Sequence, residues 1–282
     1  MAIILDGKGL AAQIRQGLKA RVEALKGQRG VTPGLAAILV GEDPASKIYV
    51  NTKARACQEV GIFVRQFLLE GGIEEGKLME LIEGINTDER FHGILVQLPL
   101  PPGIDKEKVL GSVNPQKDVD GFHPLNLGRL FMGQPYFYPC TPYGIVRLLD
   151  HYGIEIEGKV AVVVGRSLIV GRPLAAMLLN RNATVIICHT RTKELSRWTR
   201  EADILVAAAG RPQMIKGDMI KEGVVVVDVG INRMPDGKLV GDVDFPSAFE
   251  RASAITPVPG GVGPMTVAML LSNTVDSTER LT

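Results

Sequence analysis

Two side chains with catalytic chemistry lie four residues apart in the segment DPASKIYVNTKARACQEVG. Tyr49 offers a phenol and Lys53 an amine, and this spacing places both on one face of a helix, one turn apart. A lysine amine acts as a base only when it is neutral, a form that burial or nearby positive charge favours. The spacing therefore indicates either a proton-transferring pair or an ordinary pair of surface side chains.

Polar residues at two other places are further candidates. Gln97 interrupts the apolar run GILVQLP, so it is either a buried amide bonded to nearby backbone or an amide that reads a ligand. Asp118 and Asp120 lie in KDVDG, a turn-like segment in which aspartate commonly braces the backbone. None of these residues specifies a reaction individually.

The segment VAVVVGRSLIVGRP has the pattern of a nucleotide-binding turn. An apolar strand ends at Gly165, a turn containing Arg166 and Ser167 follows, and a helix-compatible run begins at Pro173. Glycine in such a turn lets the backbone approach a pyrophosphate at a helix N-terminus. The spacing departs from GxGxxG because Ser167 replaces the second glycine, so an ordinary strand–helix turn is the alternative.

The end of the next apolar run bears on the choice of cofactor. An acidic residue about 20 positions after the glycine turn binds the ribose of NAD, whereas arginine there accommodates the phosphate of NADP. The run TVIIC ends in His189, Thr190 and Arg191, with no acidic residue at that point. With Arg166 in the turn, the sequence favours NADP, because a guanidinium suits a phosphate monoester. The alternative is that both arginines are only solvated.

Small residues follow the two later apolar runs. Ala208, Ala209 and Gly210 come after one run, and Gly230 and Ile231 come after the next. Segments without bulky side chains suit the close passage of a nicotinamide ribose. They are equally typical of tight turns that pack a helix on a strand.

The composition excludes several other classes of protein. The 282-residue chain has a net charge of +1 and no Lys/Arg tract, so we expect neither a nucleic-acid nor a membrane partner. No apolar run reaches the roughly 18 residues of a membrane span. The three cysteines are scattered and the four histidines lack metal-ligand spacing. We therefore expect no metal site, a reducing compartment and a cytoplasmic location.

Strand-like and helix-like segments alternate along the chain, which predicts an α/β fold with a mainly parallel sheet and helices on both faces. We expect strands at 35–41, 62–69, 92–99, 159–164, 184–188, 203–210 and 223–230. We expect helices at 7–26, 74–86, 173–181, 192–201 and 265–278. A further helix should enter through Asp43 and Pro44, a good N-cap followed by proline at the first helical position.

The middle of the chain changes character. Residues 98–142 are rich in proline and glycine and are expected to form long functional loops rather than packed elements. A capped helix should then restart at Thr141–Pro142 and end at Gly153. These features predict two α/β lobes that join near residue 140 and have a cleft between them. We expect the second lobe to be Rossmann-like, with a modified glycine-rich turn.

Six strings taken together resemble one family. They are YVNTKARACQEVGI (49–62), GILVQLPLP (93–101), KDVDGFHP (117–124), PCTPYGI (139–145), VVVGRSLIVGRP (162–173) and TPVPGGVGPMT (256–266). The chain resembles bifunctional methylenetetrahydrofolate dehydrogenase/methenyltetrahydrofolate cyclohydrolase over essentially its whole length. This resemblance implies oxidation of 5,10-methylenetetrahydrofolate with NADP, followed by hydrolysis of the product to 10-formyltetrahydrofolate in one-carbon metabolism.

The resemblance also implies roles for individual residues. Lys53 would be the catalytic lysine, Tyr49 would lie beside it, and Gln97 would support it. Asp120, the second aspartate of KDVDG, would hold the pterin ring of the tetrahydrofolate substrate. The NADP site would be lined by Gly165, Arg166, Ser167, Thr190 and Ile231, with Arg191 added from the residue pattern above. Pro259, Gly260 and Gly261 would border the folate.

The resemblance further implies the organisation of the chain. Residues 1–140 would form a folate-binding catalytic domain, with the C-terminal helix near 266–282 packed back on it. Residues 141–265 would form the NADP-binding domain, through which a homodimer would be built. Two positions depart from the family pattern: Tyr143 stands where a more variable, often basic residue is expected, and Thr190 where serine is frequent. These departures leave the cofactor affinity open.

Two other functions compete with the bifunctional reading. One is a monofunctional NADP-dependent methylenetetrahydrofolate dehydrogenase on the same scaffold. The other is a non-catalytic dinucleotide sensor. The sensor does not need the polar set formed by Tyr49, Lys53, Gln97 and Asp120, and the monofunctional enzyme does not need Lys53 and Gln97.

Overall fold

The computed structural model describes residues 2–282, and its contacts divide the chain into two compact units. Unit 1 comprises the residues up to Ala12 together with Leu130–Gln134 and Pro139–Thr266. Unit 2 comprises Gln13–Arg129, Pro135–Tyr138 and Val267–Thr282. The division falls within three helices, which are α1 (Gly7–Arg29), α5 (Pro124–Phe131) and α10 (Val262–Leu281).

Unit 1 contains a six-stranded sheet whose neighbouring strands are all parallel, in the order β1-β11-β8-β7-β5-β6. A short antiparallel pair, β9–β10, lies outside this sheet. The elements of unit 1 are β1 (Ile3–Ile4), α6 (Cys140–His151), β5 (Val160–Val164), α7 (Gly171–Leu179), β6 (Thr184–Cys188), α8 (Leu195–Thr199), β7 (Ile204–Ala207), the 3-10 helix η1 (Gly217–Met219), β8 (Val225–Asp228), β9 (Asn232–Arg233), β10 (Leu239–Val240), α9 (Phe245–Phe249) and β11 (Ala254–Ile255).

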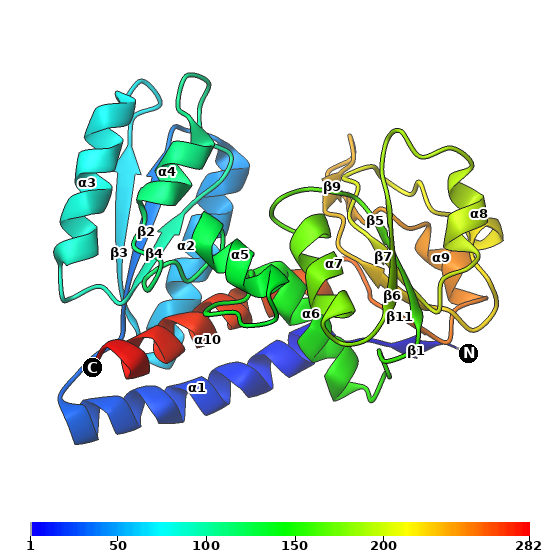
Figure 1. The fold of residues 1–282 in the computed structure, drawn as a ribbon, viewed down its shortest axis with the longest axis horizontal. Helices are drawn as coiled ribbons and strands as arrows, with labels where there is room; N and C mark the ends of the chain where they lie inside the picture. Colours follow the sequence, from blue (N-terminus) through cyan, green and yellow to red (C-terminus); the bar gives the residue numbers. More distant parts are fainter. Residues whose placement is uncertain (1) are drawn as a thin grey trace. The chain divides into compact units, whose positions relative to one another are not determined.

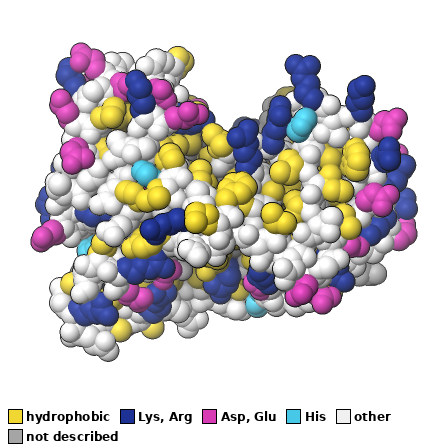
Figure 2. All heavy atoms as spheres, in the orientation of Figure 1, with side chains coloured by type: hydrophobic (Ala, Val, Ile, Leu, Met, Phe, Trp, Pro, Cys, Tyr) yellow, Lys and Arg dark blue, Asp and Glu magenta, His cyan; other side chains and the backbone are white. Residues whose placement is uncertain are grey.

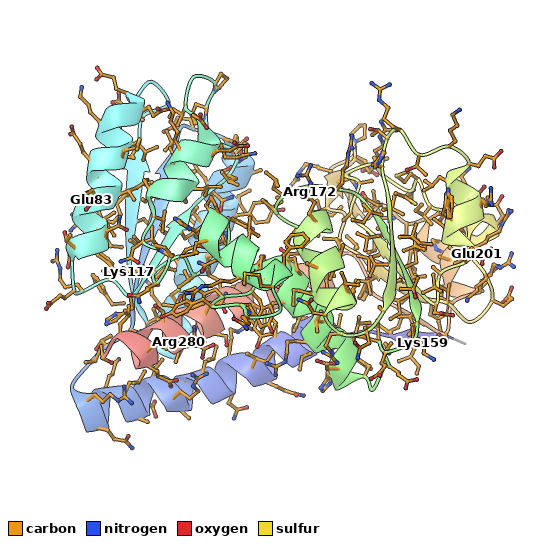
Figure 3. The ribbon with its side chains drawn as sticks, viewed as in Figure 1. Glu83, Lys117, Lys159, Arg172, Glu201 and Arg280 are labelled. Carbon is orange, nitrogen blue, oxygen red and sulfur yellow. The ribbon has the colours of Figure 1, made fainter. Side chains whose placement is uncertain are left out.

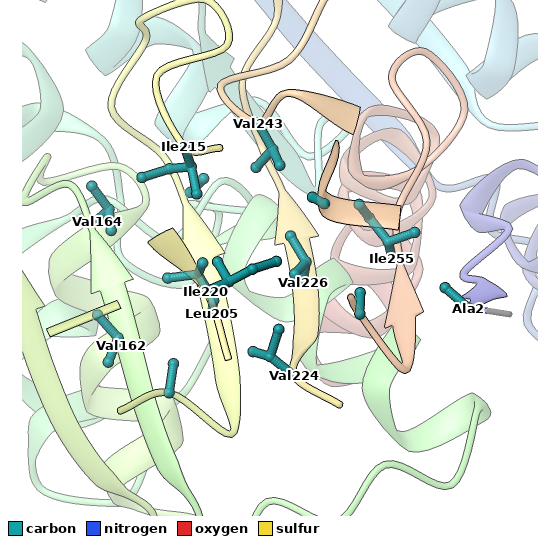
Figure 4. Close-up of a cluster of buried hydrophobic side chains, with 14 of the residues drawn as sticks. Ala2, Val162, Val164, Leu205, Ile215, Ile220, Val224, Val226, Val243 and Ile255 are labelled. Carbon is teal, nitrogen blue, oxygen red and sulfur yellow. The ribbon is translucent and has the colours of Figure 1, made fainter. Parts of the chain in front are cut away.

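The inner strands of this sheet, β5, β7, β8 and β11, form because both of their faces are buried. Val162 and Val164 of β5 point to the same face of the sheet, since side chains alternate along a strand, and they pack there with Leu205 and Val226 (Figure 4). Val163, between them, is also fully buried. Near-continuous apolar runs of this kind are typical of parallel strands that helices cover on both sides.

The order of the strands determines where a ligand can bind. Strand β5 lies between β6 and β7, so the chain runs from β5 outward to β6 and then crosses back to β7 on the other side of β5. In such sheets the ligand site lies at the carboxyl ends of the strands, at this switch point. The turn after β5 leads directly into α7. The predicted α/β fold with a Rossmann-like parallel sheet is confirmed.

Unit 2 is built on a second, three-stranded parallel sheet with the order β3-β2-β4. Its elements are β2 (Gly34–Val40), α2 (Pro44–Val60), β3 (Phe63–Leu69), α3 (Glu75–Thr87), β4 (Gly93–Val96) and α4 (Lys106–Ser112). Every residue of the central strand β2 and of β4 is buried. The core packs aliphatic side chains of both strands against α3, with Phe91 among its largest members.

Helix α2 has the ends that its sequence predicts. The Asp43 carboxylate accepts a hydrogen bond of 2.8 Å from the backbone N–H of Ser46, and Pro44 occupies the first turn. A side-chain N-cap of this kind stabilises a helix by about 1 kcal/mol. The helix ends at Gly61, whose φ of 86° is a left-handed conformation that glycine adopts at no steric cost.

Within unit 2, the later part of α1 lies beside the later part of α10 (Figure 1). The Arg21 guanidinium donates to the carboxylates of Asp276 and Glu279 at 2.6 and 2.7 Å. On α10, the Asn273 amide donates to the carbonyl of Val119 at 2.8 Å. These contacts hold the later part of α10 within unit 2, the unit that contains α2.

Two expectations for the middle of the chain are wrong. Residues 98–142 are not only loops, because α4 and α5 form there; the Asp105 carboxylate caps the first turn of α4. Helix α6 begins at Cys140 and not at Thr141, and among the described residues no side chain caps its first turn. The Thr141 hydroxyl lies 2.9 Å from the Thr266 hydroxyl. The end of α6 is as expected, since Gly153 follows it with a φ of 65°.

Acidic and basic side chains are interspersed on the visible face of each unit (Figure 2). No helix within residues 2–282 is both long and apolar enough to cross a lipid bilayer. Over the same residues, no group of three or more His, Cys, Asp or Glu side chains is arranged to hold a metal ion.

Candidate active site

The structure brings Lys53 and Gln97 together in unit 2. Lys53 lies on α2 and is half-buried, and its Nζ donates to Oε1 of Gln97 at 3.1 Å. Gln97 follows the last residue of β4, and its own Nε2 donates to the carbonyl of Leu98 at 2.7 Å. Because the amide hydrogens are directed to Leu98, the amide oxygen is the atom presented to the lysine. The amide therefore holds the amine at the carboxyl end of the sheet.

Tyr49 lies one turn before Lys53 on α2, as the spacing predicts. Its side chain is 43% exposed, whereas Val50 and Ala54, on the packed face of the same helix, are buried in unit 2. The phenol is thus accessible beside the amine. This arrangement can hold a water molecule or a flat ligand near two groups that exchange protons.

The two aspartates of KDVDG have different surroundings. Asp118 is buried, and its carboxylate accepts hydrogen bonds from the backbone of Phe122 and His123 and from the Asn126 amide, the latter two at 2.8 Å. Burial raises the pKa of Asp118, and these donors oppose the shift. Asp118 therefore braces the turn that leads into α5. Asp120 is half-buried and takes no part in that brace.

The backbone places KDVDG beside the strand that precedes Gln97. The N–H of Ile94 in β4 donates to the carbonyl of Lys117 at 2.7 Å, and Ile94 pairs with Asp118 in a parallel bridge. The ammonium of Lys117 donates to the carbonyl of Asp88 at 3.0 Å, near the end of α3 (Figure 3). Asp120 is thereby fixed in register with the sheet that carries Gln97.

In unit 1, the turn after β5 packs so closely against neighbouring backbone that only glycine fits at two of its positions. Gly165 has a φ of 135°, and a Cβ there would lie 2.2 Å from the carbonyl oxygen of Ala208. A Cβ on Gly171 would lie 2.2 Å from the carbonyl oxygen of Gly165. The Ser167 hydroxyl accepts from the N–H groups of Val170 and Gly171 at 3.1 and 3.4 Å, where α7 begins. Arg166 is exposed beside them.

The residues that follow β6 lie at the same edge of the sheet as this turn. Strands β5 and β6 pair in parallel up to Val164 and Cys188, and the Gly165 N–H donates to the Cys188 carbonyl at 2.8 Å. Thr190 and Arg191 follow, and both are exposed. Their side chains therefore stand where the ribose-phosphate end of a dinucleotide lies in such folds.

A pocket of about 130 Å³ in unit 1 joins two segments that are distant in the sequence. Its walls include Ile231, which follows β8, and the run Pro259, Gly260 and Gly261 before α10. Ile231 is 47% exposed. The structure therefore places the predicted nicotinamide-side residue and the predicted folate-bordering residues around one cavity.

Sequence reasoning missed two buried carboxylates of unit 1. Asp228 ends β8 and Asp242 follows the β9–β10 hairpin, and they are 4% and 0% exposed. The signal in the sequence is weak, because an aspartate after a strand is common in turns. Only the fold shows that both carboxylates are directed inward.

The residues present fit a dinucleotide. Gly165 and Gly171 let the backbone of the turn pack tightly with no side chain over it, the N-terminal end of an α-helix follows, and the exposed cations Arg166 and Arg191 suit phosphate groups. Arg172, the second residue of α7, adds a further exposed cation at that helix end (Figure 3).

Comparison with protein families gives two matches that together span most of the chain. Residues 5–120 match the catalytic domain of tetrahydrofolate dehydrogenase/cyclohydrolase, and residues 139–282 match the NAD(P)-binding domain of the same family. Both halves of the bifunctional architecture are therefore present.

Curated relatives align along the full length. The bifunctional protein FolD of Pelobacter propionicus is 57% identical over 280 residues, which covers 99% of both chains. The protein of the same name from Moorella thermoacetica is 57% identical over 279 residues, again covering 99% of each.

Solved structures agree with the sequence relatives. A bifunctional methylenetetrahydrofolate dehydrogenase/cyclohydrolase from Campylobacter jejuni has a TM-score of 0.99 and 53% identity, with both chains covered completely. The Trypanosoma brucei enzyme, solved with NADP cofactor and an inhibitor, has a TM-score of 0.96 and 40% identity, covering 99% of this chain and 98% of that one.

These comparisons confirm the predicted enzyme class and the predicted cofactor, NADP. The roles of the individual site residues stay predictions. On the two matched domains and the full-length identity, the chain belongs to the tetrahydrofolate dehydrogenase/cyclohydrolase family.

Proposed function

We propose that this protein oxidises 5,10-methylenetetrahydrofolate with NADP and then hydrolyses the methenyl product to 10-formyltetrahydrofolate. The observation that carries the second activity is the hydrogen bond between Lys53 Nζ and Gln97 Oε1. A dehydrogenase that lacked the hydrolytic step would not need an amine held at this place. The family membership supports both steps.

In the oxidation, the residues of this chain bind the cofactor and the substrate and orient them relative to each other. When bound, NADP⁺ would supply the acceptor for the hydride of the substrate's methylene carbon. Gly165 and Ser167 would hold the pyrophosphate, Arg166, Thr190 and Arg191 would hold the phosphate on the adenosine ribose, and Ile231 would line the nicotinamide end. The C–H bond breaks with its electron pair and leaves a cation stabilised by two flanking nitrogens. No proton moves, so distance and orientation dominate this step.

The hydrolysis, unlike the oxidation, requires proton transfers. Water adds to the methenyl carbon and loses a proton. As the bond from that carbon to one ring nitrogen breaks, the nitrogen gains a proton and the new hydroxyl loses its own to become the formyl carbonyl, so one proton is released overall. Lys53, held by Gln97 and flanked by Tyr49, takes the proton from the water and returns one to the leaving nitrogen. Asp120 accepts hydrogen bonds from the amino-substituted edge of the pterin. Pro259, Gly260 and Gly261 border the folate.

One assay separates the competing functions. The purified protein is mixed with methylenetetrahydrofolate and NADP⁺, and the absorbance of the methenyl product is followed against a blank without enzyme. A rise followed by accelerated decay supports the bifunctional enzyme. A rise that decays at the blank rate shows a monofunctional dehydrogenase. If the absorbance does not rise although the protein binds NADP⁺, the protein is a non-catalytic sensor.

We also propose that the protein is a cytoplasmic homodimer built through the NADP-binding domain, for which we take residues 141–265. Cys57 and Cys188 are buried and form no disulfide, which suits a reducing compartment. Ile187, on the edge strand β6, is 40% exposed and offers an apolar contact to a second copy. Light scattering after gel filtration gives the mass: two chains support this proposal and one chain contradicts it.

A further inference from the structure

Asp242 connects two segments of unit 1 through hydrogen bonds to one carboxylate. Its Oδ2 accepts from the backbone N–H groups of Ala209 and Gly210 at 2.6 and 2.8 Å. Its Oδ1 accepts from the N–H of Arg211 at 2.9 Å and from the Asn232 amide at 2.9 Å. Four donors converge on a fully buried group, so the carboxylate is a fixed centre rather than a surface charge.

Asp228 supports this centre from the end of β8. Its Oδ1 accepts from the N–H groups of Gly230 and Asp242, each at 2.9 Å. Its Oδ2 accepts from the N–H of Val243 at 2.9 Å. The first carboxylate therefore orients the backbone that carries the second one.

Two glycines allow the carboxylates to come this close. A Cβ on Gly230 would lie 2.3 Å from Oδ1 of Asp242, and a Cβ on Gly241 would lie 1.8 Å from Oδ2 of Asp228. Both distances are far shorter than van der Waals contact. Any larger residue would force the pair and its bound segments apart.

The segments held by Asp242 contact the proposed cofactor site. The Ala208 carbonyl occupies the space beside Gly165 that a side chain would otherwise fill. The segment after β8 carries Ile231, which lines the small pocket with Pro259. The carboxylate itself is covered on all sides, so it does not contact solvent or a ligand.

We propose that Asp242, oriented by Asp228, is a positioning residue for the NADP site and acts through the backbone of residues 209–211 and the side chain of Asn232. This inference rests on the proposed function, because it takes the turn at Gly165 and the residue Ile231 as the cofactor site. It assigns no contact between Asp242 and either ligand.

Asp242→Asn tests this role with almost no change in size. Whichever way the new amide turns, its NH₂ group faces two N–H donors that the carboxylate oxygens now satisfy. We expect the dissociation constant of NADP⁺, measured by calorimetry, to rise about tenfold, which corresponds to ~1.4 kcal/mol. Hydrolysis of methenyltetrahydrofolate, assayed without NADP⁺, should stay within about twofold of wild type, because Lys53 and Gln97 lie in unit 2.

The matched control is Asp236→Asn, an exposed aspartate of the β9–β10 turn, which should change neither quantity. An unchanged NADP⁺ affinity in Asp242→Asn overturns the inference. Equal losses of NADP⁺ binding and hydrolysis, in step with a lower folded fraction, also overturn it. If wild-type protein does not bind NADP⁺, the proposed function fails and the inference fails with it.

A milder variant covers the case in which Asp242→Asn does not fold. Asn232→Ala removes one of the four donors and leaves the three backbone bonds in place. We expect a rise of about threefold in the NADP⁺ dissociation constant with normal hydrolysis, since one neutral donor contributes less than the whole set. Unaltered affinity in this folded variant contradicts the positioning role.

Discussion

The amine of Lys53 and the carboxamide of Gln97 are joined by a hydrogen bond of 3.1 Å, and a second bond on the same amide sets its direction. The two residues come from α2 and from the end of β4, which are 44 positions apart in the chain. The side chain of Gln97 is oriented before any ligand arrives. The lysine is therefore held in one place, as a proton-transferring group must be.

Lys53→Met should separate the two activities. The change keeps an unbranched chain of similar length and removes the amine. Hydrolysis of methenyltetrahydrofolate should fall at least about 100-fold, which is typical for loss of a general acid–base group. Oxidation of methylenetetrahydrofolate should change only a few-fold, because it moves no proton.

Lys47→Met is the matched control, on the same helix and paired with Glu42 at the surface. It should leave both rates unchanged. Equal losses of both activities in Lys53→Met, or normal hydrolysis, would contradict the assigned role.

The two aspartates of KDVDG should respond differently to the same substitution. Asp120→Asn should raise the Michaelis constant for folate in both reactions by roughly tenfold, because a hydrogen-bonded charge contributes ~1.5–3 kcal/mol to binding. Asp118→Asn should instead lower the free energy of unfolding by about 1–3 kcal/mol, since its amide faces buried N–H donors. Steady-state kinetics and chemical denaturation measure the two effects, and folate constants unchanged in Asp120→Asn would refute its assignment.

Arg166→Ala should weaken binding of NADP⁺ by about 10- to 100-fold, from the loss of a charge-assisted contact to phosphate. Binding of NAD⁺ should change much less if the guanidinium reads the additional phosphate. Arg191→Ala tests the neighbouring residue in the same way. Calorimetry with both nucleotides measures the difference, and Arg181→Ala, an arginine paired with Asp150 at the far end of α7, is the control. NADP⁺ affinity that survives both substitutions would overturn the assignment.

Asp228 should make the stability depend on pH. Burial, helped by the nearby charge of Asp242, raises its pKa from 3.8 to about 6, and three backbone N–H donors oppose the shift. Between these two values the native state binds more protons than the unfolded state, so the contribution of Asp228 to stability falls as pH rises from 4 to 6. The change is at most about 3 kcal/mol.

Asp228→Asn should abolish this component. Denaturation of wild type and variant at several pH values between 4 and 7 gives the difference in unfolding free energy. That difference should vary across the window and become constant above it. A difference that is constant throughout would show that Asp228 does not titrate there.

The sequence alone predicted the elements whose signals are local. Helix α2 begins at an aspartate and a proline, and β5 ends at a glycine, and each feature acts on its own few residues. The α4 and α5 helices were missed because they are short and lie among prolines and glycines. Seven or eight residues show too little periodicity to outweigh such neighbours.

Local patterns and the resemblance of six short strings were enough to establish the α/β class, the family and NADP as cofactor. Only the tertiary structure decided which polar residues meet. It joined Lys53 to Gln97, buried Asp118 but left Asp120 half-exposed, and directed Asp228 and Asp242 into unit 1. The physical reason is that a hydrogen bond between distant residues depends on strand order and register, which arise from burial summed over a whole sheet.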